Sequence, residues 1–128
     1  MTLIFCIDDA GGMLFGGKRQ SRDRVLNEYL LSRIGEAPLW VTPYSAALFP
    51  TGRDMAFCDG EGYAFIEDSP YDLTLAEEVI LCRWNRRYPG DAFFDEQTLK
   101  THFKKIDTEE LEGSSHKKIT VETYRRNR

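Results

Sequence analysis

The stretch TLIFCIDDAGGMLFGGKRQSRDRVLNEYLLSRIG, residues 2–35, holds a short apolar run, two glycine pairs and a helical pattern, in that order. Residues 2–7 are strand formers, and the DDAGG that follows them is typical of a turn. From Ser21 onward apolar side chains recur every three or four residues, which predicts a helix with Ser21 as N-cap and Gly35 in the C-cap position. A buried first strand, a glycine-rich loop and a helix therefore open the domain.

The middle of the chain predicts short strands separated by turns. Residues 38–42 and 54–58 are apolar and bounded by Pro, Gly and Asp, which predicts two short, substantially buried strands. Residues 62–68 predict an edge strand. The pattern of residues 69–78 predicts a helix cap followed by one or two helical turns. The apolar run 79–84 then predicts extended structure.

The last third predicts a short helix or turn and then a hairpin. Asp95 is placed to cap a short helix or turn over residues 95–103. Residues 103–126 predict two strands around the turn EGSS, and the basic tail 125–128 is predicted to fray. Since no repeat, low-complexity tract or linker divides the chain, residues 1–128 are expected to form a single domain.

Composition excludes several classes of protein. A chain of 128 residues with 41% hydrophobic and 12% aromatic residues is globular. The net charge of -4 and the pI near 5.2 argue against general binding to nucleic acid or to acidic membranes, although a local basic patch is left open. Cys6, Cys58 and Cys82 match neither a disulfide framework nor a metal clip. With no basic leader and no long apolar run, the sequence predicts a cytoplasmic protein without a membrane partner.

Four blocks, taken together and in order, resemble the dihydrofolate reductase family. They resemble its first strand and active-site loop, its second and third strands, its long strand with the exit turn, and its terminal hairpin with a Ser-His pair opening the last strand. The blocks are residues 5–20, 38–59, 74–95 and 103–126. The resemblance implies a shortened, divergent dihydrofolate-reductase-like protein. Its expected fold is α/β: one domain with a mixed, mostly parallel twisted sheet, a C-terminal antiparallel hairpin and flanking helices.

The chain differs from the family at the positions that resemble the family's catalytic acid and its cofactor-binding segment. The family enters its first helix through Leu-Pro-Trp and carries one carboxylate there, whereas residues 19–21 are Arg-Gln-Ser here. Asp23 is the candidate catalytic acid that the resemblance implies, with Glu28 as the second choice. Gly52-Arg53 resembles the contact to the cofactor phosphate, but residues 59–78 lack the family's Gly-Gly pair and are too short for its cofactor segment. We therefore expect no cofactor and no reductase activity; the alternative is an NADPH-dependent reductase that uses Asp23.

The residues 8–23 also resemble small uncharacterised bacterial proteins that often carry the label ribonuclease Z. That label requires a His-x-His-x-Asp-His zinc site, and the only histidines are His102 and His116. The label would therefore be mistaken for this chain, and no metal site is predicted.

A cluster of arginines suggests a site for a small anion such as a nucleotide. Lys18, Arg19, Arg22 and Arg24 surround the start of the predicted helix, where backbone N-H groups favour an anion. The alternative is a glycine-rich loop with solvated arginines and Asp23 completing the first helical turn. The complete set of predicted ligand contacts is Arg19, Arg22, Asp23, Tyr44, Arg53 and Arg83.

Three further patterns carry weaker hypotheses. Asp8 and Asp9 could hold a cation, but successive strand residues face opposite ways, so a turn-closing role is favoured. Ser114 to His116 places serines beside a histidine, although neighbours in sequence rarely have the geometry of a catalytic triad. A homodimer that pairs through an exposed sheet edge or through Tyr88 is the third functional hypothesis.

Overall fold

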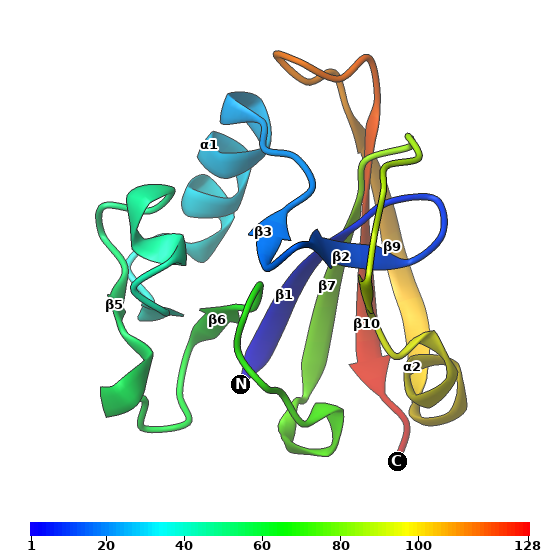
Figure 1. The fold of residues 1–128 in the computed structure, drawn as a ribbon. Helices are drawn as coiled ribbons and strands as arrows, with labels where there is room; N and C mark the ends of the chain where they lie inside the picture. The colour runs from blue at the N-terminus through cyan, green and yellow to red at the C-terminus, as the bar shows by residue number, and fades with distance from the viewer.

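A computed structural model describes residues 1–128 as a seven-stranded sheet, a small three-stranded sheet, two α-helices and three 3₁₀ turns (Figure 1). The main sheet has the order β5-β4-β6-β1-β7-β10-β9, and the small sheet the order β3-β2-β8. The strands are β1 Thr2–Ile7, β2 Gly12–Phe15, β3 Lys18–Arg19, β4 Leu39–Val41, β5 Arg53–Asp54, β6 Tyr63–Phe65, β7 Glu78–Arg83, β8 Ala92–Phe93, β9 Phe103–Leu111 and β10 Ile119–Arg126. The helices and turns are α1 Arg24–Ile34, η1 Ser45–Ala47, η2 Met55–Phe57, η3 Leu73–Leu75 and α2 Glu96–His102.

β1 lies at the centre of the main sheet, as its apolar sequence predicts. It pairs in parallel with β6 on one side and with β7 on the other. Phe5 and Ile7 are fully buried because both faces of the strand are covered. The pairings among β5, β4, β6, β1 and β7 are parallel, and those of β10 with β7 and β9 are antiparallel. The predicted α/β class, with its mixed and mostly parallel sheet, is confirmed.

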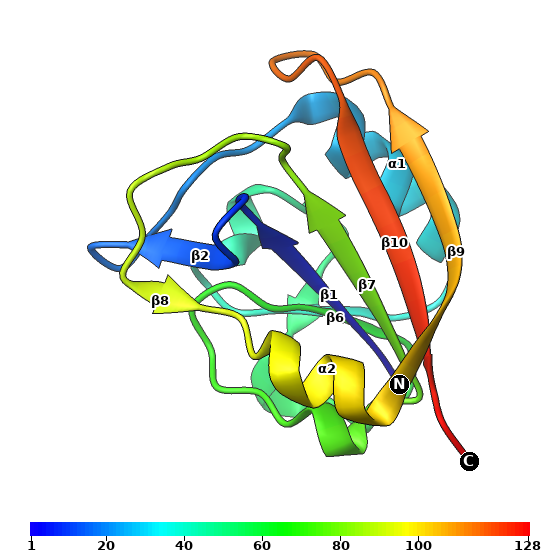
Figure 2. The ribbon, with the colours of Figure 1, turned by 90° about the vertical axis from the view of Figure 1, so that its right-hand side faces the viewer.

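The core has one layer on each face of the main sheet. On the first face α1 packs Leu26, Leu30 and Ile34 into a cluster with Ile80 and other strand residues. On the second face α2 and β8 lie over a separate cluster built around Phe5 and Leu81. Figure 2 shows α1 behind the sheet and α2 in front of it. Residues that alternate along a central strand therefore face different layers.

In the small sheet, β2 and β3 form a hairpin, and β8 pairs with the other edge of β2. Gly16 and Gly17 form the turn between β2 and β3, with φ of 58° and 76°. Two successive residues of positive φ are what a two-residue hairpin turn requires, and glycine adopts them without steric cost. The second glycine pair of the sequence is therefore a solvent-exposed hairpin turn.

α1 begins two residues later than the sequence predicted. Its N-cap is Asp23, whose carboxylate accepts hydrogen bonds from the backbone of Val25 and Leu26. Ser21 was the predicted cap, but its hydroxyl bonds elsewhere, so the carboxylate of Asp23 satisfies the free amides of the first turn. Gly35 forms the C-cap with φ of 61°, as predicted.

Two of the predicted strands are corrected by the structure. Within residues 54–58, only Asp54 belongs to a strand, and Met55–Phe57 form a 3₁₀ turn with Phe57 77% exposed. The Asp54 side chain accepts a hydrogen bond from the Ala56 N-H at 2.9 Å, which stabilises a turn in place of extended structure. β6 is not an edge strand, because it pairs with β1 and β4.

The predicted C-terminal hairpin and the helix at Asp95 are both present. β9 and β10 pair along their length with one register shift, and Asp95 caps α2. The tail is more ordered than predicted: Arg125 and Arg126 belong to β10, and the Asn127 N-H donates to the His102 carbonyl at 2.9 Å. β9 leaves a charged, exposed strand at one edge of the main sheet. Neither helix is long and apolar enough to span a membrane.

Candidate functional site

The carboxyl ends of β1, β6 and β7 meet at one end of the main sheet, the place where open α/β sheets bind ligands. The segment from β2 to α1 crosses this end and encloses a cavity of about 10 Å³, which is room for about one water. Its lining consists of Cys6, Met13, Arg19, Gln20, Ser21, Ile66, Glu67 and Trp84. The chain's own side chains therefore occupy most of this place.

Arg19 and Tyr44, two of the predicted ligand contacts, lie against each other beside this cavity. The Arg19 guanidinium stacks on the Tyr44 ring, 4.2 Å from its centroid. It also pairs with both carboxylate oxygens of Glu67, each at 2.9 Å. The hydrogen bonds that Arg19 donates to Glu67 raise the pKa of Arg19 against the opposing effect of burial. Because its charge already has a close partner, Arg19 holds the crossing segment to the sheet rather than offering a free cation.

Asp23 is 1% exposed and accepts hydrogen bonds from two parts of the chain. The Val25 N-H donates to it from α1 at 2.9 Å. From the β9–β10 loop the N-H groups of Ser114 and Ser115 donate at 3.1 and 2.9 Å, and His116 Nδ1 lies 2.9 Å away. Burial would raise the pKa of the Asp23 carboxyl, but these hydrogen bonds outweigh burial and hold the pKa well below its usual value. The anion at the start of α1 is thus Asp23 itself.

His116 connects Asp23 to two hydroxyl groups. Its ring stacks on Trp84 with centroids 4.6 Å apart, and the residue is 3% exposed. Nε2 lies 2.9 Å from Ser21 Oγ and 3.2 Å from Tyr88 Oη. The carboxylate of Asp23, the imidazole of His116 and the two hydroxyl groups therefore form one continuous hydrogen-bonded row.

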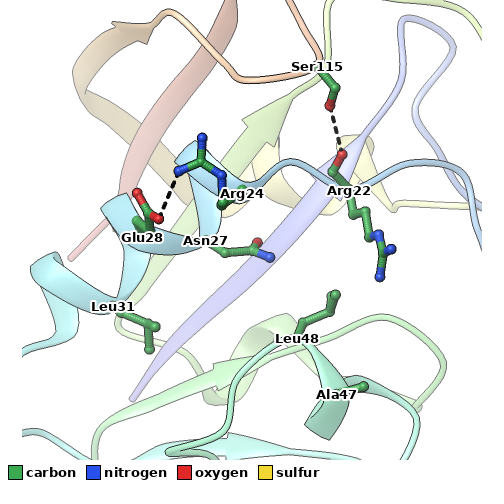
Figure 3. Close-up of a pocket in the computed structure, with 8 residues that line it drawn as sticks. All are labelled: Arg22, Arg24, Asn27, Glu28, Leu31, Ala47, Leu48 and Ser115. Carbon is green, nitrogen blue, oxygen red and sulfur yellow. Dashed lines mark hydrogen bonds and ion pairs between the residues drawn. The ribbon is translucent and has the colours of Figure 1, made fainter.

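A larger groove lies on the outside of the same region, between α1 and η1 (Figure 3). Its volume is about 450 Å³, and its lining combines polar side chains with an apolar floor: Arg22, Arg24, Asn27, Glu28, Leu31, Ala47, Leu48 and Ser115. Arg24 is paired with Glu28 at 3.1 Å, whereas the guanidinium of Arg22 makes no ion pair. The Arg22 carbonyl accepts a hydrogen bond from the Ser115 hydroxyl at 3.2 Å, which joins the β9–β10 loop to the rim of the groove.

A solved structure has a similar fold. It is the dihydrofolate reductase from Enterococcus faecalis complexed with NADP(H) and RAB-propyl; it aligns with a TM-score of 0.74 at 15% sequence identity, over 99% of this chain and 96% of that chain. The chain has the dihydrofolate reductase fold. No family model matches the sequence, and no curated protein matches it.

On this dihydrofolate reductase fold, the predicted anion contacts do not share one site. Arg83 belongs to the face of α2, because Cys82 and Trp84 on either side of it pack toward α1. It pairs with Glu122 at 2.7 Å and with Glu96 at 3.5 Å. Arg83 therefore lies on the opposite face of the sheet from α1, away from Arg22 and Asp23, with which it was grouped as a predicted ligand contact.

Arg53 is also separate from the other predicted contacts. Its guanidinium lies 5.9 Å from the centroid of the Trp40 ring. It lines a second groove, near the C-terminal end of α1, together with Gly35 and Thr51. Of the predicted contacts, only Arg22 thus offers an uncommitted charge to the groove between α1 and η1.

Asp8 has a structural role, as the turn-closing interpretation predicted. It is 1% exposed, and its carboxylate accepts hydrogen bonds from the Gly12 N-H at 2.7 Å and the Tyr88 N-H at 2.9 Å. The exposed Asp9 is not drawn into this network through its side chain. Tyr88 was named as a surface aromatic for self-association, but its hydroxyl lies in the row of His116.

Sequence reasoning missed that Ser21 and Asp23 act on one histidine. Their spacing offered only a local signal, because residues two apart in an extended segment point to the same side. The partner was not predictable from spacing, since His116 lies 93 positions from Asp23. The histidine of the SSH motif, His116, thus contacts Ser21, a serine from another part of the chain.

Proposed function

We propose that the protein binds a small anionic ligand, such as a nucleotide, in the groove between α1 and η1, and that it is not an NADPH-dependent reductase. The observation that carries this proposal is the unpaired guanidinium of Arg22 at a groove of about 450 Å³. Arginine is well suited to phosphate and carboxylate because its planar fork can donate two parallel hydrogen bonds.

The rest of the groove suits a ligand that is only partly polar. Leu31 and Leu48 contribute apolar surface for the body of a ligand, and the Asn27 amide can donate and accept hydrogen bonds. The ion pair of Arg24 with Glu28 is exposed at both side chains, with 69% and 63% of their surface accessible. Such exposed pairs contribute little energy, so Arg24 can turn to a second anionic group without a large cost.

Two features support a function without reduction of folate. Residues 59–78 contain β6, η3 and the first residue of β7, so this segment offers no α-helix on which a dinucleotide could lie. Asp23, the candidate catalytic acid, is buried and its carboxylate is engaged by His116 and the serines of the β9–β10 loop. A proton donor in a reductase would have to reach a bound substrate, which this arrangement does not favour.

Thermal denaturation with candidate ligands tests the proposal. The ligands are inorganic phosphate, adenine and guanine nucleotides, dihydrofolate and NADPH. A ligand that binds only the folded chain stabilises it by about 2.7 kcal/mol at 100 times its Kd, which raises the melting temperature measurably. We expect a shift with at least one nucleotide and none with NADPH. Absence of any shift with phosphate and with every nucleotide would contradict the proposal.

Paired arginine variants locate the binding site. Arg22→Gln is expected to weaken binding of the ligand roughly tenfold or more, because a hydrogen bond to a charged group contributes about 1.5–3 kcal/mol. Arg86→Gln removes the same charge from an exposed loop position and is expected to leave the shift unchanged. Equal losses in both variants would show that only net charge matters.

NADPH oxidation with dihydrofolate tests the alternative, and turnover that Asp23→Asn abolishes would establish a reductase.

We also propose that the protein works in the cytoplasm. Cys6, Cys58 and Cys82 are all free thiols, and unpaired cysteines are typical of reducing compartments.

A further inference from the structure

Ser21, His116 and Asp23 form a hydrogen-bonded row that uses both nitrogens of one imidazole. Asp23 Oδ2 lies 2.9 Å from Nδ1, and Ser21 Oγ lies 2.9 Å from Nε2. The three residues come from the segment before α1 and from the β9–β10 loop. A hydroxyl and a carboxylate on opposite nitrogens of one histidine is the arrangement by which serine enzymes activate a nucleophile.

The surroundings assign the proton positions in this row. The Asp23 carboxylate receives backbone hydrogen bonds from Ser114 and Ser115 and therefore remains an acceptor for a proton on Nδ1. In the tautomer that carries its proton on Nδ1, Nε2 is an acceptor, and the hydroxyl groups of Ser21 at 2.9 Å and Tyr88 at 3.2 Å both lie within reach of it. Stacking on Trp84 fixes the plane of the ring. The imidazole is thus held in the tautomer of a general base facing Ser21.

We propose that Ser21, His116 and Asp23 are a nucleophile, a general base and a positioning residue that together hydrolyse small activated carboxylic esters. This activity is independent of anion binding at Arg22, because Ser21 lines the inner cavity and Arg22 lines the outer groove. Ser21 is a partly exposed residue, and the proposal places the ester on its solvent side.

The reaction balances without a further reagent. Ser21 Oγ forms a bond to the carbonyl carbon while its proton passes to His116 Nε2. The bond from that carbon to the leaving oxygen then breaks, and the proton on Nε2 moves to the departing alcohol. A water next attacks the acyl-serine, gives one proton to Nε2 and releases the carboxylic acid, and Nε2 returns the proton to Ser21 Oγ.

Two neighbours narrow the substrate class. The Tyr88 hydroxyl lies 3.5 Å from Ser21 Oγ, so it can donate a hydrogen bond to the carbonyl oxygen as negative charge develops there. The cavity beside Ser21 has a volume of only about 10 Å³ and is lined in part by Cys6, Met13 and Ile66. A cavity of this size holds about one water and no acyl group, so the ester must react on the outer side of Ser21; the smallest acyl groups meet least steric hindrance there, and we expect acetate esters to react faster than butyrate esters.

Covalent labelling of the full chain tests the nucleophile directly. A fluorophosphonate probe followed by peptide mass spectrometry is expected to place one adduct on Ser21. The Ser21→Ala variant should lose that adduct and lower the hydrolysis of p-nitrophenyl acetate roughly 100-fold. Ser32→Ala removes an exposed hydroxyl from α1 and should retain both signals. An adduct on any other residue, no adduct, or unchanged hydrolysis in Ser21→Ala would each overturn the proposal.

Variants of the other members separate chemistry from folding. Ser21 does not cap α1, so Ser21→Ala should melt near the temperature of the parent chain; if it fails to fold, the position of the adduct on the parent chain decides. Tyr88→Phe should lower kcat while the adduct on Ser21 still forms. Asp23→Asn should lower kcat with little change in KM, because Asp23 acts on the base and does not touch the ester. A change in KM alone would assign Asp23 a purely structural role and overturn its part in the row.

Discussion

Asp23 and His116 are 93 positions apart in the chain, yet Oδ2 of the carboxylate lies 2.9 Å from Nδ1 of the imidazole. The side chains are 0% and 1% exposed, so the pair is sealed from solvent. It joins the β9–β10 loop to the first turn of α1. The position of that loop, and with it the rim of the groove at Arg22, therefore depends on one buried carboxylate.

Replacing Asp23 should destabilise the fold. Asp23→Ala removes the helix cap and leaves the donors of Ser114, Ser115 and His116 without their acceptor, so we expect the free energy of unfolding to fall by about 3 kcal/mol. Urea denaturation measures the change. Asp9→Ala removes an exposed acid from the turn after β1 and should change the stability by less than about 0.5 kcal/mol. Similar losses in the two variants would disprove the role given to Asp23.

Stability should fall at acid pH through two carboxyls. The pKa of Asp23 lies below its ordinary value of 3.8 and that of Glu122 below 4.5; in each, hydrogen bonds outweigh burial, to Asp23 chiefly from His116 and to Glu122 from Arg83. A carboxyl with a lowered pKa in the folded chain contributes stability that is fully present above its unfolded pKa and is lost as the pH falls through its folded pKa.

We therefore expect the loss to begin below about pH 4.5 and to continue well below pH 4. Urea midpoints measured between pH 7 and pH 2 follow it. Glu122→Gln removes one of the two carboxyls and should flatten the upper part of the decline. Stability that rises on acidification over this range would contradict both assignments.

Two glycines in the same loop give a matched test of packing. Gly62 has φ of 85°, and a Cβ there would overlap the Pro38 carbonyl oxygen, whereas Gly60 has φ of 89° and open space around it. Gly60→Ala should cost only the backbone strain of about 1 kcal/mol, and Gly62→Ala should cost at least about 1 kcal/mol more, because backbone must move. Equal costs for both variants would mean that the contact with Pro38 relaxes freely.

The ion pair of Arg83 with Glu122 should contribute more than an exposed pair. Their nitrogen and oxygen atoms are 2.7 Å apart, with the side chains 29% and 9% exposed. A double-mutant cycle with Arg83→Gln and Glu122→Gln should give a coupling energy of about 1–2 kcal/mol, against less than about 0.5 kcal/mol for Arg24 and Glu28 on the surface of α1. A coupling no larger than that of the surface pair would show that solvent screens both pairs equally.

The sequence predicted the elements whose signal lies within a few residues. Side-chain periodicity predicted β1, α1 and the hairpin of β9 and β10. The spacing of apolar residues indicates which face of a strand or helix packs against the core. Errors occurred where a local polar contact competed with that pattern. Asp54 turned a predicted strand into a 3₁₀ turn, and Asp23 took the capping position from Ser21.

Apolar periodicity and turn residues, which are local features of the chain, predicted one α/β domain, and the resemblance of four blocks to a known family implied the dihydrofolate reductase fold. Only the tertiary structure decided that β6 is an inner strand, that Arg83 faces α2, and that Ser21 and Asp23 meet His116. The reason is physical: the partner of a buried polar group is set by the path of the chain through space, and no spacing in the sequence encodes a contact across 93 residues.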